Sequence, residues 1–189
     1  MTRTFSLCTA LLLAFTGCRS TAPTASVPEP EALTVYLVRH AETAPDGTRD
    51  PGLSDAGRQR AGAYAERFAH AAMRAVYATE YRRTQETAAP VAEAERLDVT
   101  VVPYGSGPLD TYVARLADQV RSRLDAPDFD PGESALVVGH SNTTPALAEA
   151  LLGQPVPPIA EDEYDRLIGI LVFRDHAVLL PPAAAGQAP

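Results

Sequence analysis

The chain has 189 residues, and its 16 basic residues against 24 acidic ones give a formal net charge of -8. All 16 basic residues are arginine, which excludes Schiff-base chemistry on lysine, a lysine general base and the lysine of a P-loop. Because nucleic acid needs a basic protein face, we expect no nucleic-acid partner, and an anion would have to be held by a local cluster of arginines.

Residues 1–17 have the pattern of an export signal. A short charged segment is followed by the apolar stretch 5–15, which is too short to cross a bilayer as a helix, and by small residues typical of a cleavage site. Cys18 follows directly and resembles the lipidated cysteine of a bacterial lipobox, although Phe15 stands where that family usually has leucine. We therefore expect an exported protein, anchored through a lipid on Cys18 to the cell envelope at the outer membrane or cell surface. An ordinary secretory signal with an incidental cysteine is the alternative.

Two segments have the composition of unstructured chain. Residues 18–32, which begin with the predicted lipidated cysteine, and residues 181–189 are rich in Pro, Ser, Thr and Ala and lack apolar periodicity. We interpret the first as a flexible tether and the second as a disordered tail. Residues 33–180 are then one folded domain.

Within this domain, short β-rich runs alternate with helical patterns. Strands are predicted at 34–38, 75–78, 99–102 and 135–138, with a late edge hairpin at 167–173 and 177–180. Helices are predicted from the N-cap Ser54 onward, from Tyr81 with a kink or end at Pro90, over 112–124, and from Thr143 or Thr144. The alternation predicts an α/β fold: a three-layer sandwich with a mostly parallel central sheet and helices on both faces.

Three predicted strands run into side chains suited to phosphate binding. Arg39 and His40 follow the first strand, Arg82 and Arg83 follow the second, and His140 follows the fourth. Sites in open α/β sheets form beyond the carboxyl ends of the strands, so these residues should meet at one edge of the sheet. Each signal alone would indicate only a structural histidine or a solvated helix start, and their shared position is what points to a site.

These segments resemble the motifs of the histidine phosphatase superfamily, the phosphoglycerate mutase-like fold. LVRHAET at 37–43 matches its Arg-His-Gly/Ala signature, and residues 53–61 are similar to the start of its first helix. Residues 79–88 resemble its second arginine segment, with Arg83 rather than Arg82 four residues before the threonine, and residues 138–141 resemble its second histidine motif. The resemblance covers the whole domain, and the short length implies a minimal, phosphatase-like member without the insertions of mutases or phytases.

The resemblance implies a metal-independent hydrolase of phosphomonoesters or phosphoramidates that uses no cofactor. His40 is then the nucleophile that forms a phosphohistidine, and the phosphate is held by Arg39, Arg83 and His140, with the hydroxyl of Thr43 as a further contact. Two planar guanidinium groups suit the three equatorial oxygens of a phosphoryl group, and nearby cations lower the pKa of an imidazole and favour its neutral form. The expected partner is a small phosphorylated substrate or a phosphoprotein.

The proton donor for the leaving group stays open. The family usually takes a Glu or Asp from a loop after the third strand, and the first acid of that loop here is Asp110, which suits the N-cap of the next helix equally well. Glu80 and the acidic group 161–163 are the other candidates.

Two other functions are alternatives. Ser141, with Asp162 or Asp165 and His176, has the chain order of an α/β-hydrolase triad, but the β-branched Thr143 suits the strained nucleophile turn poorly. A non-catalytic lipoprotein that binds a phosphorylated ligand through the same arginines would keep the fold without turnover. We expect no metal site, because the chain has no HExxH motif, and only one of its two cysteines lies outside the predicted signal.

Overall fold

The computed structural model describes residues 31–182, whose strands form one central sheet in the order β3-β2-β4-β1-β5-β6. The strands are β1 Leu33–Arg39, β2 Met73–Ala78, β3 Val99–Val101, β4 Ser134–Gly139, β5 Leu167–Val172 and β6 Ala177–Leu179. β1, β2, β3 and β4 run parallel, whereas β5 is antiparallel to β1 and β6 is antiparallel to β5. The late pair of strands therefore forms a hairpin at one edge, as predicted.

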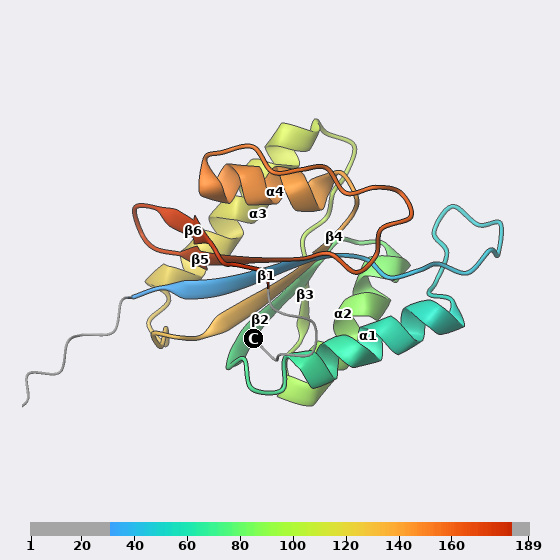
Figure 1. Ribbon diagram of the computed structural model, residues 1–189, viewed down its shortest axis with the longest axis horizontal. Helices are drawn as coiled ribbons and strands as arrows, with labels where there is room; N and C mark the ends of the chain where they lie inside the picture. The colour runs from blue at the N-terminus through green and yellow to red at the C-terminus, as the bar shows by residue number, and fades with distance from the viewer. Residues whose placement is uncertain (1–30, 183–189) are drawn as a thin grey trace, which may run out of the picture.

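Helices cover both faces of this sheet (Figure 1). They are α1 Asp55–Arg67, α2 Arg82–Glu95, α3 Leu109–Arg121 and α4 Thr143–Leu152, with a 3-10 turn at Ser122–Asp125. α1 and α2 pack together on one face, and α3 and α4 pack together on the other. The predicted three-layer α/β sandwich with a mostly parallel sheet is confirmed.

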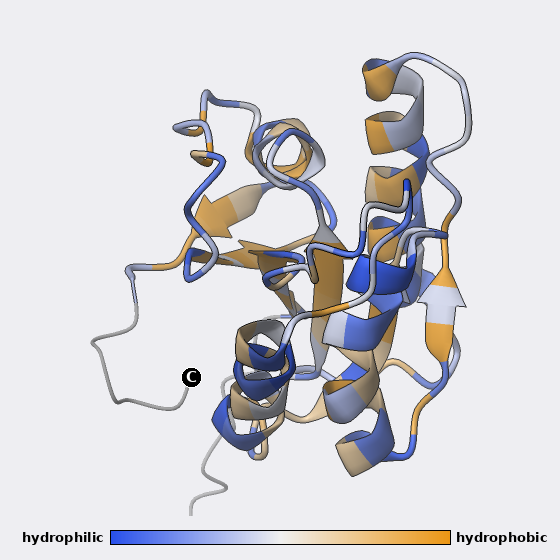
Figure 2. Cartoon of the chain, turned by 90° about the vertical axis from the view of Figure 1, so that its right-hand side faces the viewer, coloured by the Kyte–Doolittle hydropathy of each residue, from blue (hydrophilic) through white to orange (hydrophobic). Residues whose placement is uncertain are grey.

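The alternation of side chains along β1 explains why both faces need helices. Leu33, Val35 and Leu37 belong to the core cluster under α3 and α4, while Tyr36 and Val38 belong to the cluster under α1 and α2. Successive side chains of a strand point to opposite faces, so a strand that is apolar at every position must be covered twice. Figure 2 shows the apolar strands between the helical layers.

α2 corrects one expectation. The sequence predicts a kink or an end at Pro90, and the end is wrong, because the helix continues to Glu95 and is capped by Arg96, which adopts the left-handed conformation with φ 57°. Val91 and Ala92, just after the proline, are buried against the sheet. Their burial offsets the roughly 3 kcal/mol that an internal proline costs a helix.

Several predicted segments lie outside the described residues: the signal peptide 1–17, Cys18 with the tether as far as residue 30, and the tail from residue 183. Within residues 31–182, none of the helices has the length and apolar run needed to cross a membrane.

Candidate active site

The carboxyl ends of β1, β2 and β4 bring the predicted phosphate-binding side chains to one pocket. β1 and β4 are neighbours in register, with Arg39 opposite Gly139, and the amide of His40 donates to the carbonyl oxygen of Gly139 at 2.9 Å. The pocket has a volume of about 320 Å³ and is lined by Arg39, His40, Tyr81, Arg83, Tyr104, His140, Ser141, Asn142 and Glu161. It therefore combines both predicted histidines with two predicted arginines.

His40 is held in one tautomer. Its Nδ1 lies 2.8 Å from the carbonyl oxygen of Ala41, which only accepts hydrogen bonds, so Nδ1 carries the proton and Nε2 keeps its lone pair. Burial, followed by the charges of Arg83 and Arg39, lowers the pKa of His40 to about 4. At neutral pH the side chain is an uncharged imidazole with a free nitrogen.

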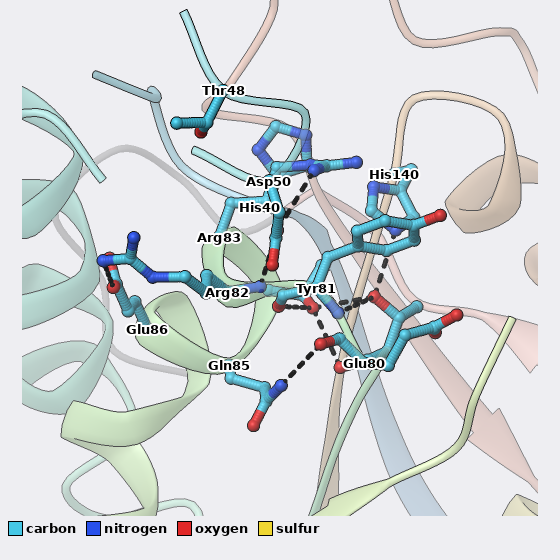
Figure 3. A network of polar contacts seen from close by, with 12 residues as sticks. His40, Thr48, Asp50, Glu80, Tyr81, Arg82, Arg83, Gln85, Glu86 and His140 are labelled. Atoms are coloured by element: carbon cyan, nitrogen blue, oxygen red, sulfur yellow. Dashed lines mark hydrogen bonds and ion pairs between the residues drawn. The ribbon is translucent and has the colours of Figure 1, made fainter. Parts of the chain in front are cut away.

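A chain of hydroxyl groups orients His140 (Figure 3). The Thr84 hydroxyl donates to the carbonyl oxygen of Tyr81 at 2.8 Å, so the Thr79 hydroxyl donates to Thr84 Oγ1, also at 2.8 Å. Thr79 Oγ1 is then the acceptor for His140 Nε2, 3.1 Å away, and Nδ1 of neutral His140 carries no proton. Burial, followed by the charges of Arg83 and His40, lowers the pKa of His140 to about 3. The rings of His40 and His140 meet edge to face with centroids 5.4 Å apart.

Arg39 is fixed by a distant segment of the chain. Its Nη1 donates to the carbonyl oxygens of Ala160, Glu161 and Glu163 at 2.9, 2.7 and 3.1 Å, and its Nη2 lies 3.4 Å from the carboxylate of Glu161. The guanidinium carbon also lies 4.2 Å from the centroid of the Tyr164 ring. Arg39 Nε is buried and has no hydrogen-bond partner within residues 31–182. The Arg39 guanidinium is thus a buried cation that is held in place on one side, and such a charge favours an anionic ligand in the pocket.

Arg83, and not its neighbour Arg82, reaches the pocket. Arg83 Nη1 lies 3.7 Å from Asp50 Oδ1, and its guanidinium carbon lies 4.4 Å from the centroid of the Tyr81 ring. Arg82 forms an exposed ion pair with Glu86 at 3.0 Å, one helical turn further along α2. Figure 3 shows the two arginine side chains leaving the start of α2 in different directions.

Two predicted site residues do not reach the pocket. Thr43 forms an isolated β-bridge with Leu53 and is not among the lining residues. Asp110 is exposed in the first turn of α3, where its carboxylate accepts from the amide of Thr111 at 2.7 Å. α3 begins three residues earlier than predicted, so Asp110 belongs to the helix N-terminus instead of the preceding loop.

The other acidic candidates have different positions. The carboxylate of Glu80 accepts from the amides of Tyr104 and Gly105 at 2.6 and 3.1 Å, and these contacts keep its pKa low although burial raises it. Glu80 therefore stabilises the loop after β3 through these hydrogen bonds, and it does not line the pocket. Glu161 does line it, with one carboxylate oxygen 3.1 Å from Ser141 Oγ and the other on Arg39.

The aromatic residues of the pocket could not be predicted from the sequence. Tyr81 lies edge to face with His140 at a centroid distance of 5.4 Å, and the guanidinium group of Arg83 lies over the Tyr81 ring. Tyr104, in the loop after β3, also lines the pocket and packs on Tyr112 at a centroid distance of 5.0 Å. Both depend on contacts between separate elements.

The serine-hydrolase alternative is not assembled. Ser141 follows the carboxyl end of β4 and donates to Glu161. His176 lies in the β5–β6 turn, beyond Val172, which pairs with Leu33 at the opposite end of β1. Ser141 and His176 are therefore at opposite ends of the sheet. In the described range, no three His, Cys, Asp or Glu side chains gather as a group that could hold a metal ion.

Part of the sequence that forms this site matches the sequence model of a known protein family. The sequence model of the histidine phosphatase superfamily (branch 1) matches residues 35–104, which contain His40 and Arg83. No match was found among curated protein sequences.

Solved structures share the fold. A mycobacterial glucosyl-3-phosphoglycerate phosphatase in complex with inorganic phosphate has a TM-score of 0.65 at 19% identity, covering 84% of this chain and 100% of that one. The protein histidine phosphatase SixA in complex with tungstate has a TM-score of 0.60 at 16% identity, covering 79% and 95%. The resemblance to the histidine phosphatase superfamily is confirmed, and the chain has the fold of these phosphatases.

Proposed function

We propose that this protein is a metal-independent hydrolase of phosphomonoesters or phosphoramidates that acts through a phosphohistidine on His40. The observation that carries the proposal is the state of His40: its Nδ1 proton is engaged by Ala41, and its unprotonated Nε2 belongs to a pocket that also holds Arg39 and Arg83. A neutral imidazole nucleophile beside two guanidinium groups is what phosphoryl transfer requires. The superfamily match and the fold support phosphatase activity.

The reaction has two steps. In the first, the lone pair of His40 Nε2 attacks phosphorus, a P–N bond forms and the bond from phosphorus to the leaving group breaks. In the second, water attacks the phosphorus of the phosphohistidine and gives a proton to the carboxylate that had protonated the leaving group, the P–N bond breaks, and His40 returns to its neutral form as inorganic phosphate leaves. Arg39 and Arg83 stabilise the equatorial oxygens in both steps.

His140 changes protonation when substrate binds. Its Nε2 proton is directed at Thr79, and burial with the nearby Arg83 keeps the second proton off. A phosphoryl dianion offsets those positive charges and favours a proton on Nδ1. His140 then donates to a phosphoryl oxygen while Thr79 holds the ring in place.

Glu161 is the proposed proton donor to the leaving group. Within residues 31–182 it is the carboxyl side chain that lines the pocket, and its contact with Ser141 keeps it at the rim. The proton passes to the leaving oxygen or nitrogen as its bond to phosphorus breaks.

Hydrolysis of p-nitrophenyl phosphate without added metal tests the proposal. We expect turnover by the unmodified protein and by Ser141→Ala, and none by His40→Ala. An acid-labile phosphoryl group on the peptide that contains His40, trapped by rapid quenching and found by mass spectrometry, is the expected intermediate. Phosphate binding without turnover in all three proteins would instead favour a non-catalytic module.

The role of Glu161 has a separate test. Glu161→Gln should slow the hydrolysis of alkyl phosphates, whose leaving groups have a high pKa, by about 100-fold or more, and affect p-nitrophenyl phosphate far less. An equal loss for both substrates would show that Glu161 only holds Arg39.

We also propose that the enzyme is exported and anchored to the cell envelope through a lipid on Cys18. The support is the sequence pattern of residues 1–18. Cys18→Ala should move the protein from the membrane fraction to the soluble fraction and abolish labelling by a radioactive fatty acid. A membrane-bound, labelled Cys18→Ala protein would contradict the anchor.

A further inference from the structure

A groove leads away from the phosphate pocket across α4. The pocket shares Ser141, Asn142 and Glu161 with a second depression of about 440 Å³. This one shares Ala146 and Glu149 with a third depression of about 700 Å³ that reaches the start of α3. We call the second and third depressions together the α4 groove. Its course from Asn142 to Glu149 follows about 10 Å of the helix axis, the length of about three extended residues.

The walls of the α4 groove are mainly apolar. The side chains near the pocket are Pro145, Ala146, Val156, Pro158 and Ile159. Those near α3 are Pro108, Leu109, Val113 and Ala150. The groove can therefore remove apolar groups of a bound molecule from water, which a pocket for the phosphoryl group alone would not need.

The charges along the groove are all negative. Asp110, Glu149 and Glu161 are its charged lining residues, and no arginine is among them. Glu161 is near Arg39, but Asp110 and Glu149 form no ion pair with any residue of the described range. The Asp110 carboxylate accepts from the amide and the hydroxyl of Thr111 at 2.7 and 3.4 Å, and the Glu149 carboxylate accepts from the amide of Val156 at 3.0 Å. An arginine-rich pocket thus opens into an apolar groove with free carboxylates.

We propose that the α4 groove binds the leaving group of the substrate and that this leaving group is a peptide, so that the substrate is a phosphorylated side chain flanked by apolar and basic residues. The inference rests on the proposed function. Apolar side chains fill the groove, basic ones pair with Asp110 and Glu149, and the phosphoryl group enters the pocket. Nucleoside di- and triphosphates and sugar bisphosphates are poor substrates because their remaining phosphates meet these carboxylates.

The test compares two phosphopeptides of equal length with the same central phosphotyrosine. One carries leucine and arginine around it, and the other carries leucine and glutamate. We expect the full-length protein to hydrolyse the basic peptide with a kcat/KM about tenfold higher at low salt, since each exposed ion pair contributes about two- to fivefold. The ratio should fall toward one in high salt, because exposed charges are screened.

Two variants with the same change in net charge locate the effect. Asp110→Asn with Glu149→Gln should bring the kcat/KM ratio of the two peptides close to one. Glu93→Gln with Asp118→Asn, on exposed helix positions that do not line the groove, should leave the ratio at its original value.

Other outcomes overturn the inference. Equal kcat/KM for the two peptides, or an unchanged ratio in the first double variant, would show that the groove does not select a basic peptide. Faster hydrolysis of a long-chain alkyl phosphate or a nucleotide than of the basic peptide would do the same. Failure of the proposed function looks different: then p-nitrophenyl phosphate is not hydrolysed either.

Discussion

Replacement of His40 by asparagine should change how the stability of the protein depends on pH. Burial holds the pKa of His40 at about 4, against 6.5 for an unperturbed histidine. Between these two values the unfolded chain binds more protons than the folded chain. The stability contributed by neutral His40 is therefore complete above pH 6.5 and is lost as the pH falls through about 4.

The size of the effect follows from the two pKa values. Integration of the linkage relation gives a loss of about 2 kcal/mol in the free energy of unfolding between pH 7 and pH 5 from this one side chain. His40 is only 7% exposed, so solvent screening reduces the figure little. His140, whose pKa is also lowered by burial, is present in both proteins, so its contribution largely cancels in the difference.

Urea unfolding followed by circular dichroism at pH 7, 6 and 5 provides the measurement. Between pH 7 and pH 5, His40→Asn should lose about 2 kcal/mol less than the unmodified protein, whatever its absolute stability. Equal losses in the two proteins would refute the reasoning, because they would mean that the folded chain lets His40 take up a proton as freely as the unfolded chain does.

Further predictions concern the scaffold of the site. Gly57→Ala makes a methyl group clash with the carbonyl oxygen of Glu42, within the 37–43 motif, and should cost about 2 kcal/mol or more, whereas Gly62→Ala in the same helix meets no atom within 4 Å and should gain about 0.5–1 kcal/mol. Thermal unfolding separates the two, and equal melting temperatures would contradict the predicted clash. Glu133→Gln removes the buried carboxylate partner of the mostly buried Arg123, which keeps only the exposed Asp128, and should cost about 2 kcal/mol in urea unfolding, while an unchanged midpoint would show that the Glu133 pair contributes nothing.

The fold was predictable from the sequence because its strands are apolar at nearly every position. Such runs need cover on both faces, and the helical patterns between them supply it. The prediction for Arg39, His40, Arg83 and His140 rested on the same logic, since the ends of neighbouring parallel strands meet without help from the loops. The pocket that contains all four is the direct outcome of the sheet order.

The parts that sequence reasoning missed depend on contacts between distant segments. Arg39 is fixed by Glu161, 122 positions later, from a segment between α4 and β5 that has no periodic pattern. From the sequence, Asp110 can be either a loop acid or the N-cap of the next helix, because the apolar spacing of α3 becomes clear only from Tyr112 onward. The sequence predicts a kink or an end at Pro90 because local propensity does not include the burial of the residues that follow it.

The central place of β1 in the sheet also governs the order in which the protein assembles. β1 is synthesised first, but its neighbours in the sheet are β4 and β5. Thr34 therefore cannot pair with Ser134 on one side or Leu171 on the other until those later strands have been synthesised. While the chain is being synthesised, this mainly apolar strand therefore has two open edges, which are the surfaces that recruit other chains into aggregates. Loss of the C-terminal hairpin would leave one of these edges open permanently. Such a truncated protein would retain every histidine phosphatase motif and should still accumulate as insoluble material.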